Sequence, residues 1–212
     1  MTGAGTDTAT TSAPGGTGDG HLDGRTARAQ RTRTRVVDAV LELVRAGNPR
    51  PTARQIAEKA QISLRSVYVH FDDLDDLFGA AAQRHLELLS GYLEPVDATL
   101  PIDERINAFA EQRAALFEWA GAVTDAALLW EPSSPALKEV LQRGGRVGWH
   151  DVRRLFRQCV PEGDEGERVL EAINAAASSS AWGVWRRRRG LSRDRARDVL
   201  VTTVTRLLGH SR

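Results

Sequence analysis

Two helix start signals follow each other closely in the segment TARQIAEKAQISLRSVYVHF, residues 52–71. Thr52 precedes Gln55 by three positions, which is the spacing of a capping box, and Ser63 offers a second side chain that can cap a helix. Both helices must be short, because the second start comes soon after the first. Two short helices joined by a tight turn predict a helix-turn-helix, whose second helix enters the major groove of DNA.

Helical periodicity continues along the rest of the chain. Apolar residues recur at helical spacing from Val36 to Val44 and in later stripes as far as Leu207, and Gly47, Pro132 and Pro135 interrupt them. We find no alternating strand pattern, no Asn-Gly hairpin signal and no repeat of solenoid period. The sequence therefore predicts an all-α fold of about nine helices, with an N-terminal three-helix unit and a larger C-terminal helical domain.

Composition narrows the class of protein. The chain has 212 residues, of which 41% are hydrophobic, so it can form a substantial core. Its net charge of +1 does not by itself indicate a nucleic-acid partner. The single Cys159 excludes an internal disulfide, and no apolar run is long enough to span a membrane. Without an apolar signal core at the N-terminus, we expect a cytoplasmic protein.

The N-terminal residues differ from the remainder. Residues 1–24 have almost no bulky apolar side chains, so we expect them to be disordered, and an arginine-rich run follows from Arg25 to Arg35. We predict a disordered basic arm over residues 1–30, a helix-turn-helix DNA-binding domain over 31–78, and a second domain over 79–212.

Catalytic patterns are not found. Cys159 has no glycine elbow or paired base near it in sequence, and the neighbouring residues His150 and Asp151 point in different directions on a helix. The chain contains no HExxH, no CxxC and no glycine-rich phosphate loop, and its five histidines lack metal-ligand spacing. We expect a protein that is not an enzyme and that has no cofactor or metal, although triads assembled from distant residues stay open.

The second short helix carries side chains suited to DNA. An arginine fork such as that of Arg65 can donate twice to guanine, Tyr68 and His70 can reach phosphates, and Leu64 or Val69 can meet a thymine methyl group. The alternatives are a solvated Arg65, a core Tyr68 and a His70 that packs on the fourth helix. The predicted DNA-binding residues are Thr52, Arg54, Ser63, Leu64, Arg65, Ser66, Tyr68, Val69 and His70.

The segment TARQIAEKAQISLRSVYVHFDDLDDLF resembles the N-terminal signature of the tetracycline-repressor (TetR) family of transcriptional regulators. The similarity covers about residues 34–80 and rests on Thr52, Ile56, Ala57, Ala60, Ile62, Ser63, Val67, Tyr68, His70, Phe71 and Leu77. It implies a homodimer that binds a palindromic operator on double-stranded DNA, more often as a repressor than as an activator. It also implies release from DNA by a small-molecule effector, whose identity the sequence does not indicate.

Two departures from the family pattern keep other functions open. Gln61 stands where the turn usually has glycine, and Leu74 stands where a phosphate-contacting lysine is usual, among Asp72, Asp73, Asp75 and Asp76. We hypothesise that a basic arm compensates for this acidic cluster by tracking DNA, through Arg25, Arg28, Arg31 and Arg33. The alternatives are a constitutive DNA-binding protein of the same fold and a small-molecule-binding protein without an operator.

The resemblance also assigns roles to the C-terminal domain. AWGVWRRRRGLSRDRARDVLVTTVTRLL is similar in layout to the last two helices of the family, which form its dimer interface. The expected interface residues are Ile173, Ala177, Ser180, Val184, Leu200, Val204 and Leu207, with core packing in one subunit as the alternative. The expected ligand-binding residues, which plain core packing also explains, are Phe109, Arg113, Phe117, Trp119, Trp130, Trp149 and His150. We expect the block Arg186 to Arg189 to end a helix rather than to bind nucleic acid.

Overall fold

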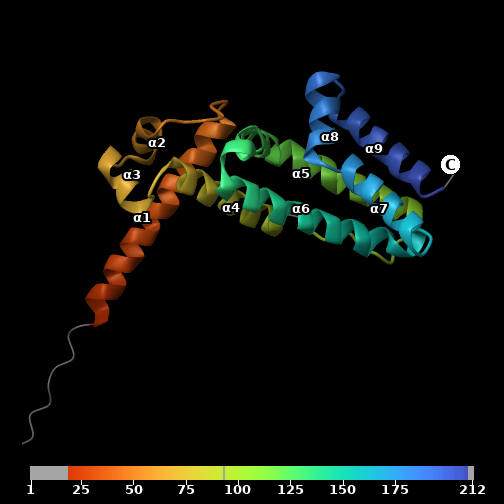
Figure 1. The fold of residues 1–212 in the computed structure, drawn as a ribbon, viewed down its shortest axis with the longest axis horizontal. Coiled ribbons are helices and arrows are strands. Elements are labelled where there is room, and N and C mark those ends of the chain that lie inside the picture. The colour runs from red at the N-terminus through yellow and green to blue at the C-terminus, as the bar shows by residue number, and fades with distance from the viewer. Residues whose placement is uncertain (1–18, 93, 210–212) are drawn as a thin grey trace, which may run out of the picture.

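The computed structural model describes residues 19–92 and 94–209, which form nine α-helices and no strand (Figure 1). The all-α prediction is therefore confirmed. The helices are α1 (Asp19–Arg45), α2 (Ala53–Ala60), α3 (Leu64–His70), α4 (Leu74–Tyr92), α5 (Ile102–Trp130), α6 (Pro135–Phe156), α7 (Asp164–Ala176), α8 (Ser179–Gly183) and α9 (Arg193–Leu207). Short 3-10 turns follow α5 and α6, and a π-helical segment, Val184–Arg188, follows α8.

One hydrophobic core joins the first four helices. It contains buried Leu41 from α1, Ile56 from α2, Val67 from α3 and Leu77 from α4. Val123, near the end of α5, completes it, so the N-terminal unit rests on the C-terminal domain rather than standing apart. Gly47 ends α1 at a φ of 94°, a conformation that glycine adopts without steric cost.

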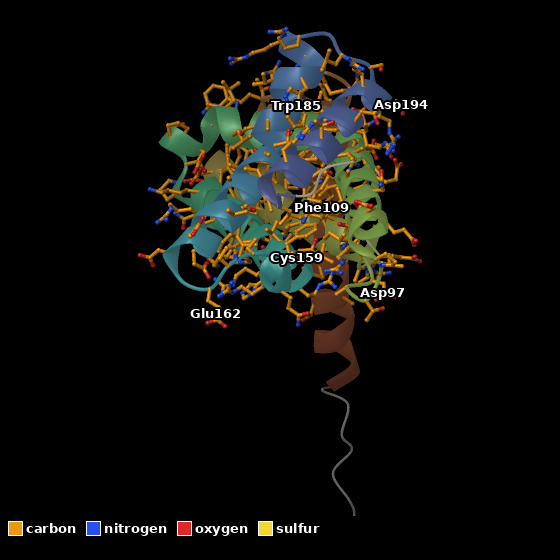
Figure 2. The ribbon with its side chains drawn as sticks, turned by 90° about the vertical axis from the view of Figure 1, so that its right-hand side faces the viewer. Asp97, Phe109, Cys159, Glu162, Trp185 and Asp194 are labelled. Atoms are coloured by element: carbon orange, nitrogen blue, oxygen red, sulfur yellow. The ribbon has the colours of Figure 1, made fainter. Side chains whose placement is uncertain are left out.

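A second core lies among α5, α6, α7 and α9. Phe109 of α5 and Phe156 of α6 meet edge to face at 5.3 Å between ring centres, and Leu170, Ile173 and Leu200 surround them. In the view along the molecule from its C-terminal end, Phe109 lies between the helices (Figure 2). Helix α4 packs against α1 on one side and against α5 and α6 on the other, so it belongs to both halves of the chain.

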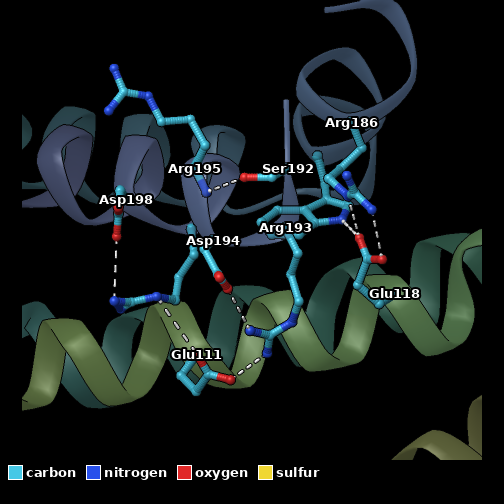
Figure 3. Close-up of polar contacts among 10 residues, drawn as sticks. Glu111, Glu118, Arg186, Ser192, Arg193, Asp194, Arg195 and Asp198 are labelled. Atoms are coloured by element: carbon cyan, nitrogen blue, oxygen red, sulfur yellow. Dashed lines mark hydrogen bonds and ion pairs between the residues drawn. The ribbon is translucent and has the colours of Figure 1, made fainter. Parts of the chain in front are cut away.

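Ion pairs fix the last helices to α5. Glu118 accepts hydrogen bonds from Trp182 Nε1 at 2.9 Å and from Arg186 Nε at 2.6 Å, and Glu111 pairs with Arg193 (Figure 3). The hydrogen bond from Arg186 is the main reason that the pKa of Glu118 lies below its usual value. Arg187 pairs with Asp125 at 2.7 Å. The first two arginines of the Arg186–Arg189 block are thus bound to carboxylates of α5, in agreement with a structural role.

One prediction about the chain's organisation is corrected. Residues 19–30, expected to be a disordered arm, belong to α1, whose first turns project from the body of the molecule (Figure 1). Residues 1–18 of that arm lie outside the described part of the chain. The domain boundary predicted between residues 78 and 79 lies within α4, which packs against both halves of the chain, and it stays a prediction. No helix among the described residues is long and apolar enough to cross a membrane.

Candidate nucleic-acid interface and cavity

The caps predicted for α2 and α3 are both formed. Thr52 Oγ1 accepts from the Gln55 backbone at 3.3 Å, while the Gln55 side chain accepts from the Thr52 backbone at 2.9 Å. Ser63 Oγ accepts from the Ser66 backbone at 3.1 Å. Gln61 ends α2 in the left-handed region, with φ 54° and ψ 46°. In this conformation a residue with a side chain costs roughly 1 kcal/mol more than glycine. The backbone of Gln61 is therefore strained, and the surrounding packing must offset this cost.

Helix α3 presents a mixed polar and apolar face to solvent. Val67 is buried, but Leu64, Tyr68 and Val69 are 42%, 51% and 69% exposed. Arg65 is exposed between them. Exposed apolar side chains next to an arginine on one short helix are typical of a recognition surface rather than of a solvated one. Seven of the predicted DNA-binding residues are exposed: Thr52, Arg54, Ser63, Leu64, Arg65, Tyr68 and Val69. The other two, Ser66 and His70, are half-buried.

Two arginines of α1 hold the ends of the short helices. Arg33 Nη1 donates to the His70 carbonyl at 2.5 Å, and its guanidinium lies 4.1 Å from the centre of the Phe71 ring. Arg35 Nη2 donates to the Ala60 carbonyl at 2.6 Å. These carbonyls are at the carboxyl ends of α3 and α2, where positive charge is stabilising. Arg33 therefore positions α3, and its predicted contact with DNA stays a prediction.

The other arm residues stay as predictions. Arg28 and Arg31 are exposed on α1, and Arg31 Nε bonds to the Ala27 carbonyl of its own helix. The side chain of Arg25 lies outside the described part.

We expect Arg33→Ala to lower the free energy of unfolding by roughly 1–2 kcal/mol, because a charged donor and its ring contact are lost. Urea unfolding measures this loss, and Arg31→Ala is the matched control, since Arg31 bonds only to its own helix. If Arg33 were merely a DNA arm residue, both variants would unfold like the parent protein.

The acidic cluster has a local structural function. Asp73 Oδ1 accepts from the Asp76 backbone at 2.9 Å and so caps α4, and Asp76 lies 3.8 Å from the Arg33 guanidinium. Leu74 packs against the N-terminal core. Part of the negative charge of the cluster thus stabilises a helix N-terminus and pairs with Arg33.

A cavity of about 780 Å³ lies behind this unit, between α4, α5, α6 and the end of α7. Its volume is in the range of small-molecule sites. Most of its wall is apolar, and α4 contributes a stretch of it that includes Ala82, His85, Leu86 and Leu89. The other apolar residues are mainly Leu116, Phe117, Val123, Val140, Leu141 and Val152.

Arg113 is the buried charge of the cavity. Its Nη2 atom pairs with Asp151 Oδ2 at 2.7 Å, and its guanidinium lies 4.8 Å from the centre of the Phe109 ring. Burial lowers the pKa of Arg113, and the Asp151 carboxylate opposes that shift. Asp151 also pairs with Arg154 at 2.7 Å, while Arg113 Nε is buried without a hydrogen-bond partner.

His85 connects the cavity with the N-terminal unit. Its ring stacks on Trp119 at 5.1 Å between centres and 2° between planes, and the Arg45 guanidinium at the end of α1 lies 4.9 Å from the same tryptophan ring. Burial first, and then the Arg45 charge, lower the pKa of His85 to about 4, against a smaller opposing effect of the Ala120 backbone. The imidazole is therefore neutral at pH 7, and its contact with the Ala120 backbone falls short of good hydrogen-bond geometry.

Solved structures with the same arrangement of helices are transcriptional regulators. A regulator from Rhodococcus superposes with a TM-score of 0.69 at 17% identity, over 84% of this chain and 96% of its own. A TetR-family regulator from Streptomyces coelicolor gives 0.68 at 19% identity, over 84% of this chain and 79% of its own. A transcriptional regulator from Saccharomonospora viridis, solved in complex with choline, gives 0.65 at 17% identity, over 82% of this chain and 96% of its own.

The chain has the TetR-family fold. These likenesses are between three-dimensional structures, and no protein-family model and no curated protein sequence matches the chain.

Within this TetR fold, three of the seven predicted ligand-binding residues line the cavity: Arg113, Phe117 and His150. The other four have different roles, which corrects the prediction. Phe109 is wholly buried in the second core, and Trp149 packs against that core beneath Arg153. Trp119 lies between His85 and Arg45, and the Trp130 ring lies 3.6 Å from the Arg50 guanidinium of the loop before α2.

Sequence reasoning missed His85, Gln112 and Asp151 as cavity residues. A weak signal for His85 existed, because this histidine interrupts the apolar stripe of α4 beside Leu86. A lone histidine in such a stripe indicates that a polar group is needed at that position. Gln112 and Asp151 have no comparable signal, since polar residues at helix positions like theirs usually face water.

The residues predicted for the dimer interface differ in burial. Four of them, Ile173, Ala177, Leu200 and Val204, are buried in the second core of one subunit, so the prediction is wrong for them. Leu207 is half-buried against the same core. Ser180 and Val184 are exposed. Core packing therefore explains most of the apolar stripe that the sequence assigned to a second subunit.

Proposed function

We propose that this protein is a homodimeric transcriptional repressor that binds a palindromic operator through α3 and is released by a small molecule bound in the cavity. One observation carries the proposal: α4 packs on the helix-turn-helix unit and also forms a wall of the cavity. An occupant that shifts α4 therefore changes the position of α3. Such an occupant must bind the DNA-free arrangement more tightly than the DNA-bound one, because only differential affinity moves the equilibrium.

Two cation–π contacts support this coupling. Arg45 on Trp119 and Arg50 on Trp130 join the N-terminal unit to α5, the helix that forms another wall of the cavity. Each contact is worth about 0.5–2 kcal/mol, which is in the range of the coupling free energies of allosteric proteins. His85 touches one of these two tryptophans directly, so only His85 and Trp119 separate a cavity ligand from Arg45 of α1.

The outward faces of α7 and α9 are the surface that we propose for the dimer. Their exposed and half-exposed residues include several small side chains that permit close helix crossing, with charges of both signs: Arg168, Glu171, Ala172, Ala175, Thr202, Thr203 and Arg206. Two-fold symmetry of the proposed dimer requires a palindromic operator, and we expect its half-sites to lie one helical turn, or a multiple of it, apart.

The test is selection of bound sequences from random duplex DNA with the purified protein at near-physiological salt. Enrichment of a palindrome supports the operator-binding dimer and provides a probe for ligand release. No enrichment from a dimeric protein contradicts the proposal and favours a small-molecule-binding protein without an operator. An operator that no compound releases favours the constitutive DNA-binding alternative.

We expect Arg65→Ala to weaken binding to the selected operator by about 1–3 kcal/mol and to relax base preference at one position, because an arginine fork reads guanine. Fluorescence anisotropy on operator and on random duplex measures both effects. An equal loss on the two duplexes would instead assign Arg65 to a phosphate.

A further inference from the structure

Two buried polar side chains and one half-buried one interrupt the apolar wall of the cavity. His85 is 4% exposed and Arg113 is 6% exposed. Arg113 Nε has no hydrogen-bond partner, and the contact of the His85 ring with the Ala120 backbone falls short of good hydrogen-bond geometry. Gln112 uses its amide nitrogen for the Glu94 carbonyl, at 2.7 Å, and its Oε1 atom is buried without a partner. A buried polar group without a partner costs about 1–3 kcal/mol, so these atoms favour any occupant that bonds to them.

The charges of the wall balance. The Arg113 and Arg154 guanidinium groups both pair with Asp151, and Glu131 supplies a second carboxylate among the lining residues. His85 adds no charge at neutral pH, since burial and Arg45 hold its pKa at about 4. A cation in the cavity meets no unpaired carboxylate beside His85, and an anion must compete with Asp151 for the guanidinium groups. The free-energy cost of desolvating a charged ligand is thus only partly offset by contacts in the cavity, whereas a neutral ligand has a small desolvation cost.

These polar groups lie at two places along α5. His85 stacks on Trp119, while Gln112 and Arg113 are nearly two helical turns earlier on the same helix. At 1.5 Å per residue, residues 113 and 119 are about 9 Å apart along the axis. A ligand that meets both groups must therefore be elongated, with polar atoms near its two ends and an apolar body between them.

We propose that the cavity binds an uncharged, elongated and largely apolar molecule that donates a hydrogen bond to His85 at one end and accepts one from Arg113 Nε at the other. This inference rests on the proposed function, because it names the class of effector for the same cavity. His85 connects that effector with the N-terminal unit, because its ring stacks on Trp119 and the Arg45 guanidinium lies over the same tryptophan ring.

The test uses 4-acetyl-4′-hydroxybiphenyl, in which a rigid apolar body separates a phenol donor from a ketone acceptor. Its relatives are 4-acetylbiphenyl without the donor, 4-hydroxybiphenyl without the acceptor, the matching 4-carboxylate and the matching 4-aminomethyl cation. Calorimetric titration of the full chain at pH 7 measures each affinity. We expect the bifunctional neutral compound to bind best, with a loss of about tenfold for each deleted hydrogen-bonding group.

Two variants assign the contacts. His85→Phe keeps an aromatic ring against Trp119 but has no nitrogen, so it should abolish the advantage of the hydroxyl group and leave that of the ketone. Arg113→Lys keeps a cation for Asp151 but lacks the Nε–H group, so it should do the reverse. Thermal unfolding of each variant confirms that it is folded. His85→Phe should unfold at the parent's temperature or above it, because a buried polar group without a well-formed hydrogen bond is removed.

The outcomes separate this inference from the proposed function. Preferential binding of the carboxylate or of the cation, or equal losses for all compounds in His85→Phe, overturns the ligand class. A failure of all five compounds to bind overturns it as well, while operator binding, measured separately, is unaffected. Binding of the bifunctional compound without release of operator DNA supports the ligand class and contradicts ligand-controlled repression.

Discussion

Replacing Phe109 by alanine is expected to lower the free energy of unfolding by about 3–5 kcal/mol, which is the usual cost of removing a buried aromatic ring. Phe109 is 0% exposed and contacts both Phe156 and the Arg113 guanidinium, so its loss leaves a void in the second core and removes a support of the buried cation. Urea unfolding gives the free energy, and the melting temperature should fall by roughly 10 °C.

A matched pair of variants separates core packing from ligand contact at this position. Phe109→Leu preserves most of the volume and should cost about 1.5 kcal/mol or less. Leu129→Ala, at a side chain that is 61% exposed, should change stability by no more than about 0.5 kcal/mol. If Phe109 lined the cavity, as the sequence suggested, the alanine variant would stay nearly as stable as the parent and would change ligand affinity instead.

Replacing Val69 by glutamate is expected to weaken operator binding by on the order of 100-fold, or about 3 kcal/mol, because a carboxylate would be placed against the phosphates of the groove. Val69 is 69% exposed on α3, so the fold does not depend on its side chain. A negative charge near the carboxyl end of α3 costs at most about 1 kcal/mol of stability. Anisotropy titration with the selected operator measures the effect on DNA, and thermal unfolding measures the effect on the fold.

Leu129→Glu is the control for this experiment, since it introduces the same charge at a similarly exposed position at the end of α5. Its operator affinity should stay within about twofold of the parent value, because net charge alone has a small effect far from the groove. Equal losses in the two variants, or parent-like binding by Val69→Glu, would show that α3 is not the element that enters DNA.

The residues that the sequence placed correctly are those governed by local chemistry. Thr52 and Ser63 cap α2 and α3 as expected, because a capping oxygen needs only the backbone a few residues further along the chain. Gly47 ends α1, and Pro132 and Pro135 mark the break after α5, for the same reason. The exposure of Leu64, Arg65, Tyr68 and Val69 follows from the burial of Val67 on the opposite face of α3 and of Phe71 directly after the helix.

Only the tertiary structure decided which neighbour each buried face meets. Helical spacing indicates that Ile173 and Leu200 are covered, but a second subunit and the subunit's own core would produce the same stripe. The contact of Arg33 with the His70 carbonyl depends on how α1 packs against α3. The contacts of Arg45 and Arg50 with tryptophans of α5 depend on how α1 and its following loop meet α5. Cavity residues such as His85 are likewise defined by the gap between helices. Local sequence thus determined the helices and the surface proposed to read DNA, whereas packing between distant segments determined the cavity and its connection to that surface.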